Sequence, residues 1–461
     1  MVIAGGGSME ILGRRDRVAM MIERLARLAF GVVVVLSPFR LRQVLEERSI
    51  GALFHDYTDI RIAASELALL VLLGLWIAGR LTRPRPLETG PGWLRWSGLL
   101  LLATTWLGVP GSIDPELSAA NAAALTVYAG LVLYVRNEIP GPRALVIPVL
   151  AMLAVQAVVG IGQVVLQRSL GLSALGELHL DPLVSGASIV TTLEGVRLLR
   201  AYGLTDHSNI LGGLLVFGLC VLAWLLDRSN GPALPVPRWL TVAAALVAAL
   251  TLVATVLAFS RGAWLALAVG AACGLAIALR ARRREAARRW LVAIGVGGLI
   301  SLAVAIPYGS AFAARVDLSP DRPASEIRSV DERLALADAA IRVAAAHPLL
   351  GTGIGTLPEA MAAAAPDLRY PPQPAHIVLL TAFAETGVLG ALGLAGLLLG
   401  PWAALRRPIA AGLAPAAALL AAIVVVGLFD YYPWAFPAGR TWTAIGIGLW
   451  AAVVAPMPER A

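Results

Sequence analysis

Lysine is absent from this chain of 461 residues, and all 37 of its basic residues are arginine. Charged residues make up only 14% of the sequence, whereas hydrophobic residues make up 58%. Because a soluble domain has about 25% charged residues, this composition excludes an ordinary soluble protein. Cysteine is also scarce: Cys220 and Cys273 lie in apolar runs, which excludes a disulfide framework and a cysteine-based metal site.

Apolar runs long enough to cross a bilayer, about 20 residues each, recur along the chain. Lipid offers the backbone no hydrogen-bond partners, so each run must be helical. We therefore predict an all-α polytopic membrane protein with about 12 transmembrane helices, forming a single integral membrane domain over residues 1–461. Residues 1–8, which contain G-G-G-S, are expected to be an artificial addition outside the fold. The predicted spans are 20–39, 62–79, 94–109, 117–135, 144–166, 208–226, 239–259, 262–280, 290–306, 376–400, 410–429 and 440–456.

The arginines indicate how the chain crosses the membrane. When both termini are placed in the cytoplasm, most arginines fall on that side, and the densest cluster is in the connection 280–289. This is the positive-inside pattern. The clusters flank spans and do not line one basic face, so the net charge of +8 does not indicate nucleic-acid binding. We expect a multi-pass protein of a cell membrane, with both termini cytoplasmic.

Two outward segments are long, 167–207 and 307–375. Within the second, the pattern predicts a helix over about 325–346 that lies along the membrane surface. Its apolar face is expected to carry Leu334, Ala337 and Ile341, with acidic residues largely on the other face. Long loops of this kind usually have a function. The acidic residues are Asp331, Glu332 and Asp338.

Some outward arginines oppose the topological preference and need another explanation. Arg200 precedes a span, Arg261 lies in a tight turn between two spans, and Arg333 lies on the predicted surface helix. A guanidinium group matches the oxygens of phosphate or carboxylate, so three together could hold a diphosphate. Each could instead pair with a carboxylate such as Asp206 or with lipid headgroups. Pairing with a carboxylate or a headgroup is the weakest explanation for Arg261, because a tight turn between two spans has little room for a charged side chain without a function.

His376 stands where the tenth predicted span begins, shortly after the stiff sequence P-P-Q-P. An imidazole can take a proton from a hydroxyl, although a single interfacial histidine is also often a structural hydrogen-bonding group. Glu385 lies about two turns into the same span, where a carboxylate is costly without a partner. Asp430 adds a polar group at the same edge. Gly351, Gly353 and Gly355 are expected to form a turn and not a phosphate-binding loop.

The residues from about 200 to 390 resemble the O-antigen ligase and O-antigen polymerase superfamily of bacterial envelope glycosyltransferases. The resemblance rests on the order and spacing of four motifs. They are R-A-Y-G-L-T-D-H-S-N-I-L-G-G, F-S-R-G-A-W-L-A-L, H-P-L-L-G-T-G-I-G-T and A-H-I-V-L-L-T-A-F-A-E-T-G-V-L-G. The resemblance implies a GT-C-like fold in the bacterial cytoplasmic (inner) membrane, with a large extracytoplasmic loop carrying surface helices.

The resemblance also implies an activity. Family members transfer a saccharide from an undecaprenyl-diphosphate carrier to an acceptor hydroxyl on the outer, periplasmic face of the membrane, without cofactor or metal. By position, His376 matches the catalytic base, Arg261 and Arg333 match the diphosphate-binding arginines, and Arg200 matches a further basic position. Many relatives have H-N where this chain has His376-Ile377. The supporting polar residues are expected to be Glu385, Asp206, Asn209 and Asp430.

Three functions therefore remain open from the sequence. The first is a ligase that joins a glycan to a lipid or glycan acceptor, and the second is a polysaccharide polymerase of the same superfamily. The third, from another class, is a transporter of lipid-linked saccharides. Transporters place charges near the middle of the bilayer and often contain repeated halves. Here the spans are nearly free of charge and no repeat is evident, which favours an enzyme.

Overall fold

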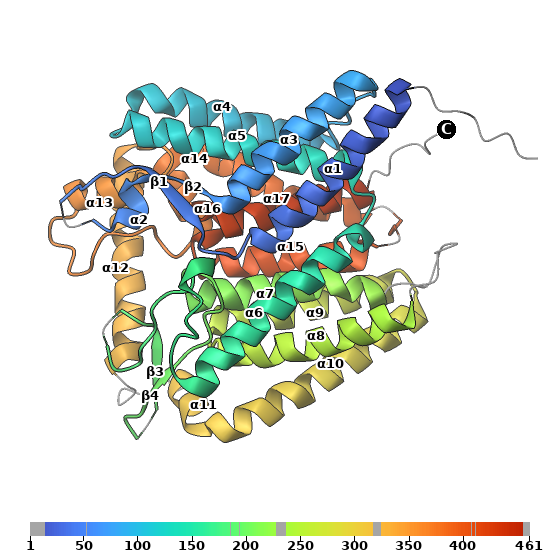
Figure 1. Ribbon diagram of the computed structural model, residues 1–461. Coiled ribbons are helices and arrows are strands. Elements are labelled where there is room, and N and C mark those ends of the chain that lie inside the picture. The colour runs from blue at the N-terminus through green and yellow to red at the C-terminus, as the bar shows by residue number, and fades with distance from the viewer. Residues whose placement is uncertain are drawn as a thin grey trace, which may run out of the picture.

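A computed structural model describes residues 14–454, apart from residues 52, 185, 193, 227–236, 317–323, 407 and 411. The segment 1–8 lies outside the described residues. Long helices form a bundle (Figure 1). They are α1 (Arg14–Leu36), α3 (Ala64–Thr82), α4 (Gly92–Gly108), α5 (Pro115–Glu138), α6 (Val146–Leu166), α7 (Ser208–Leu222), α8 (Arg238–Leu257), α9 (Arg261–Arg280), α10 (Arg284–Ala305), α14 (Val378–Leu399), α15 (Leu413–Gly427) and α17 (Pro437–Val454).

Each predicted span overlaps one of these helices, which confirms that these segments are helical. Within the described residues, 8 helical stretches are long and apolar enough to cross a membrane. The other predicted spans coincide with α1, α4, α15 and α17, of which α4 has 17 residues and α15 has 15. The chain is therefore an all-α membrane protein, while about 12 spans and a GT-C-like arrangement stay predictions.

The predicted outward segments meet at one end of the bundle, which we call the loop end (Figure 1). Contacts between segments far apart in the sequence hold this end together. Most involve the first outward segment, residues 40–61, which is therefore built into the loop end. The linking pairs are Arg40–Asp206 at 2.9 Å, Arg48–Asp114 at 2.7 Å, Tyr57–Tyr431 at 2.6 Å and Ile113–Thr352 at 3.1 Å.

The loop end also contains short elements. Two small antiparallel sheets lie there, one of β1 (Arg42–Glu46) with β2 (Ile60–Ala63) and one of β3 (Ile189–Thr191) with β4 (Arg197–Leu199). The hairpin of β1 and β2 was not predicted from the sequence. Runs of four or five residues carry little pattern. The short helices are α2 (His55–Thr58), α11 (Gly309–Val316), α13 (Leu357–Ala364) and α16 (Tyr432–Ala435).

The predicted surface helix is α12 (Ala324–Ala346), which runs across the loop end (Figure 1). The face that packs against the rest of the protein is not the predicted apolar face. Leu334 is 66% exposed and Ile341 55% exposed, and they share their face with the exposed Asp338. The buried face packs with residues of α13 and α14 and consists of Leu336, Ala339, Ala340, Val343 and Ala344. Small alanine side chains allow close packing there, and hydrophobicity alone did not single them out.

Candidate active site

Two of the three predicted arginines line one small cavity at the loop end, which we call the arginine cavity. Arg261 begins α9 and Arg333 comes from α12, and a third cation, Arg315 at the end of α11, lies beside them. Asn209 from the first turn of α7 and Asp430 line the same cavity. Helices that are separated in the sequence thus place three arginines around one space, an arrangement suited to an anion.

Arg200 does not line this cavity but contacts Asn209, which does, and Arg200 is only 4% exposed. Its guanidinium donates to the Ala258 carbonyl oxygen at 2.8 Å and to Ser188 Oγ and Asn209 Oδ1, each at 2.6 Å. Asn209 in turn donates from Nδ2 to Asp430 Oδ2 at 3.2 Å. Arg200 therefore positions the polar wall of the cavity through Asn209.

Arg315 was missed by the motif comparison. It is 8% exposed, and its Nε and Nη2 donate to the Phe259 carbonyl oxygen at 3.1 Å and 2.6 Å. Phe259 has a φ of +46°, a conformation rare for residues other than glycine. Arg261 Nη1 also donates to the Arg315 carbonyl oxygen at 3.2 Å. The only sequence signal for Arg315 is that it breaks the positive-inside rule.

His376 lies just before α14, with its ring packed edge-on against Tyr431 at a centroid distance of 5.0 Å. Its Nδ1 is buried and has no hydrogen-bond partner among the described residues. Burial lowers the pKa of His376 to about 4; nearby Asp430 acts to raise it and Arg333 to lower it further. The imidazole is therefore neutral at pH 7 and retains a lone pair that can accept a proton.

Tyr431 connects His376 to the first outward segment. Its hydroxyl lies 2.6 Å from the Tyr57 hydroxyl and donates to Gln373 Oε1 at 3.1 Å. Gln373 belongs to the predicted stiff segment and also donates to Glu332 Oε1 of α12 at 2.7 Å. Burial raises the pKa of Tyr431 well above its usual value. Tyr431 and Gln373, the residues near His376, are thus held by contacts with each other, with Tyr57 and with Glu332 of α12.

Glu385 is 3% exposed and is held by specific donors within the loop end. Trp434 Nε1 donates to its Oε2 at 2.7 Å, and the backbone N–H groups of Gly355 and Leu357 contribute further hydrogen bonds. The glycine-rich segment is a turn, as predicted: Gly351, Gly353 and Gly355 all have positive φ. This turn encloses the carboxylate of Glu385 and is not a phosphate-binding loop.

The glycine-rich turn packs against α14 at Gly387, where the helix is interrupted. Gly387 has a φ of +70°, and a Cβ there would collide with the backbone of Leu349. Backbone N–H groups of the turn donate to α14 carbonyls next to the break: Thr352 to Ala384 at 3.0 Å and Gly353 to Glu385 at 2.9 Å. The break therefore joins the outward loop to the helix that follows His376.

Asp206 is placed apart from the arginine cavity. Its Oδ1 pairs with Arg40 Nε at 2.9 Å and with Arg42 Nη2 at 2.8 Å. Its neighbour His207 caps α7, where Nδ1 accepts from the Asn209 N–H at 3.0 Å. The structure thus connects Asp206 with the first outward segment through Arg40 and Arg42.

Residues 246–395 match a protein-family model described as O-antigen ligase. This match confirms the resemblance to the O-antigen ligase and polymerase superfamily. The matched segment includes Arg261, Arg333 and His376, whereas Arg200 and Asp430 lie outside it. No curated protein matches the chain. The apolar helices indicate a multi-pass membrane protein, and its residues 246–395 are similar to the O-antigen ligase family.

Proposed function

We propose that the protein is an inverting glycosyltransferase that moves a saccharide from an undecaprenyl-diphosphate carrier to an acceptor hydroxyl. The observation that carries this proposal is the position of His376 beside the arginine cavity. The His376 ring packs on Tyr431 at a centroid distance of 5.0 Å, and the adjacent residue, Asp430, lines that cavity together with Arg333. The reaction requires a proton acceptor and a binding site for a diphosphate. His376 and the arginine cavity, which lie close together, can supply them.

In the proposed reaction, the acceptor O–H gives its proton to the imidazole of His376 while its oxygen attacks the anomeric carbon. The bond between that carbon and the diphosphate oxygen breaks, and the diphosphate leaves with the electron pair. Its growing charge is neutralised by Arg261, Arg333 and Arg315, which already line the cavity. Fixed cations lower the barrier because they need no reorganisation during the reaction, so we propose transfer without a metal ion.

We place this site on the periplasmic side of the inner membrane. The arginine-rich connection 280–289 joins α9 to α10 at the end of α9 away from Arg261. By the positive-inside rule that end is cytoplasmic, so the loop end faces outward and both termini face inward. A saccharide donor whose diphosphate lies at the outer membrane surface reaches the arginine cavity directly in this orientation.

The product formed from a labelled undecaprenyl-diphosphate glycan tests the proposal. The purified protein in lipid nanodiscs is expected to release undecaprenyl diphosphate and to join the glycan to an added acceptor. A single transfer to a lipid acceptor identifies a ligase, and growing chains identify a polymerase. If the labelled lipid crosses the bilayer of liposomes without any new glycosidic bond, the protein is a transporter and the proposal is wrong.

The pH dependence of transfer follows from the pKa of His376. The neutral imidazole is the active form, so activity is lost as the pH falls through a pKa of about 4. We expect kcat/KM to stay level between about pH 6 and pH 8 and to decline below about pH 5, because this parameter reports the ionisation of the free enzyme. Initial rates with a labelled donor measure it. A decline centred near the ordinary histidine value of 6.5 would contradict the burial of this ring.

A further inference from the structure

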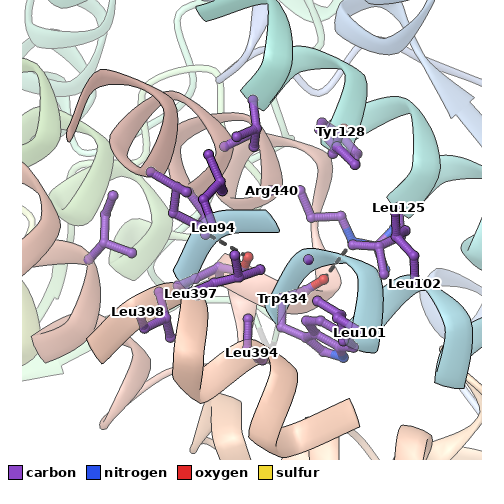
Figure 2. A pocket seen from close by; sticks show the side chains of 18 of the residues that line it. Leu94, Leu101, Leu102, Leu125, Tyr128, Leu394, Leu397, Leu398, Trp434 and Arg440 are labelled. Carbon is purple, nitrogen blue, oxygen red and sulfur yellow. Dashed lines mark hydrogen bonds between the residues drawn. The ribbon is translucent and has the colours of Figure 1, made fainter. Parts of the chain in front are cut away.

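A large cavity between α4, α5, α14 and α17 has a mostly apolar wall and encloses about 310 Å³. Leucines form much of this wall (Figure 2), among them Leu94, Leu101, Leu394, Leu397 and Leu398. A selective ligand site combines an apolar wall with several convergent polar groups. This wall therefore suits hydrocarbon in general and selects no particular ligand. A smaller space elsewhere in the bundle has the opposite character, because charged side chains line it.

This smaller space, which we call the inner cleft, lies between α1, α3 and α5 at the end of the bundle away from the loop end. Helix α1 begins at this end, α3 and α5 finish there, and α1 runs beside α3 in Figure 1. In the orientation proposed above, this end is cytoplasmic. The charged residues that line the inner cleft are Glu23, Arg27, Arg80, Arg83, Arg85 and Glu138.

The two glutamates of the inner cleft are already engaged by its own residues. Glu23 Oε1 accepts from Arg85 Nη2 at 2.5 Å. Glu138 Oε1 accepts from Trp76 Nε1 at 3.1 Å and from Arg80 Nη2 at 3.4 Å. The guanidinium of Arg80 also lies over the Trp76 ring, 4.9 Å from its centroid. With one arginine matched to each glutamate, the lining keeps an excess of two positive charges.

Several donors of the inner cleft lack an acceptor. Arg27 and Arg83 form no hydrogen bond or ion pair within the part of the chain that the structure describes. Tyr134, which also lines the inner cleft, is 1% exposed, and its buried hydroxyl has no partner among the described residues. The same holds for Arg80 Nε. Buried polar groups are normally satisfied, so these donors indicate a ligand that accepts hydrogen bonds and carries negative charge.

The size and surroundings of the inner cleft narrow the choice of ligand. The space inside it is about 20 Å³, and a single water molecule needs about 10–15 Å³, so only a compact group such as a phosphate fits. Leu28 and Leu81, which follow Arg27 and Arg80 in the sequence, are 67% and 73% exposed. Apolar side chains beside a cationic cleft suit a phosphate that carries hydrocarbon chains better than a free phosphate ion.

We propose that the inner cleft binds the phosphate group of an anionic phospholipid from the cytoplasmic leaflet. Arg27 and Arg83 balance its charge, the Tyr134 hydroxyl donates to a phosphate oxygen, and the acyl chains lie along Leu28 and Leu81. A zwitterionic phospholipid has the same phosphate but no net charge, so it leaves the excess of cations unbalanced. Because the inner cleft lies at the other end of the bundle from the arginine cavity, this assignment does not depend on the transferase function.

Native mass spectrometry of the full chain in detergent, titrated with phosphatidylglycerol, phosphatidylcholine or inorganic phosphate, tests the assignment. The wild type should bind phosphatidylglycerol about tenfold more tightly than phosphatidylcholine, since each basic residue near a headgroup contributes about 1.4 kcal/mol or less. Tyr134→Phe should raise the Kd for phosphatidylglycerol about tenfold, because a hydrogen bond to a charged group is lost. The ring keeps its contacts with Phe30 and Trp76, at centroid distances of 5.4 Å and 5.8 Å, so the melting temperature without added lipid should be unchanged.

Arg24 supplies a matched control for the cations, because it is an exposed arginine of α1 that does not line the inner cleft. Arg27→Ala should raise the Kd for phosphatidylglycerol about fivefold, and Arg24→Ala should leave it within about twofold of the wild type. Equal losses in these two variants, or an unchanged Kd in Tyr134→Phe, would overturn the proposal. Inorganic phosphate that binds as tightly as phosphatidylglycerol would make the source a free phosphate and overturn the lipid assignment. Binding is measured without any transfer assay, so failure of the transferase function leaves this test intact.

Discussion

Replacing His376 by glutamine is expected to lower the rate of saccharide transfer by about 10²- to 10⁴-fold, the usual contribution of a general base. Glutamine keeps much of the bulk and polarity of the imidazole but cannot take up a proton. The substitution removes the buried Nδ1 of His376, which has no hydrogen-bond partner among the described residues, in a ring whose pKa of about 4 leaves it neutral. Initial rates with saturating donor and acceptor measure the effect.

The exposed His347 at the end of α12 provides a matched control. The His347→Gln variant should transfer saccharide at the wild-type rate, and both variants should unfold at the wild-type temperature. Addition of free imidazole to the smaller His376→Ala variant should restore part of the activity, which a purely structural role of the ring would not allow. The base assignment is wrong if His376→Gln retains more than about a tenth of the wild-type rate.

The helices were predictable from the sequence because a bilayer imposes a simple requirement. A run of about 20 apolar residues has to satisfy its backbone internally, so composition alone located each span. The packing of α12 was not predictable in the same way. Leu334 and Ile341 are large apolar side chains that are exposed, whereas the buried face has Leu336 together with alanines and a valine. Close approach to α13 and α14 requires small side chains, and this depends on the neighbours.

The site was predictable where a residue belongs to a contiguous motif and not where it belongs to a long-range contact. Arg261 and His376 lie within such motifs, and Arg333 lies on the predicted helix that precedes one. Arg315 and Tyr57 do not, and they reach the site through contacts with the Phe259 carbonyl oxygen and the Tyr431 hydroxyl. Asp206 illustrates the opposite error, because it lies in a motif but pairs with Arg40 and Arg42 away from the arginine cavity.

Removal of the arginines that line the cavity should slow transfer nearly as strongly as removal of the base. We expect Arg261→Ala and Arg333→Ala each to lower kcat by about 10²- to 10³-fold, the usual loss when one group that stabilises developing charge is removed. Arg342 lies on the same helix as Arg333 but pairs with Asp338 at 3.2 Å. The Arg342→Ala variant is therefore a control that should leave transfer unchanged.

The pattern of kinetic losses distinguishes a role in the transition state from simple donor binding. The diphosphate gains charge as its bond to the sugar breaks, so kcat should fall more than the KM for the donor rises. Arg333→Lys keeps the charge but loses the planar fork of donors, and it should recover only part of the rate. The double variant should lose less than the product of the two single losses, because both groups act on one diphosphate. Unchanged kcat in Arg333→Ala, or fully independent losses, would show that the cavity does not hold the leaving group.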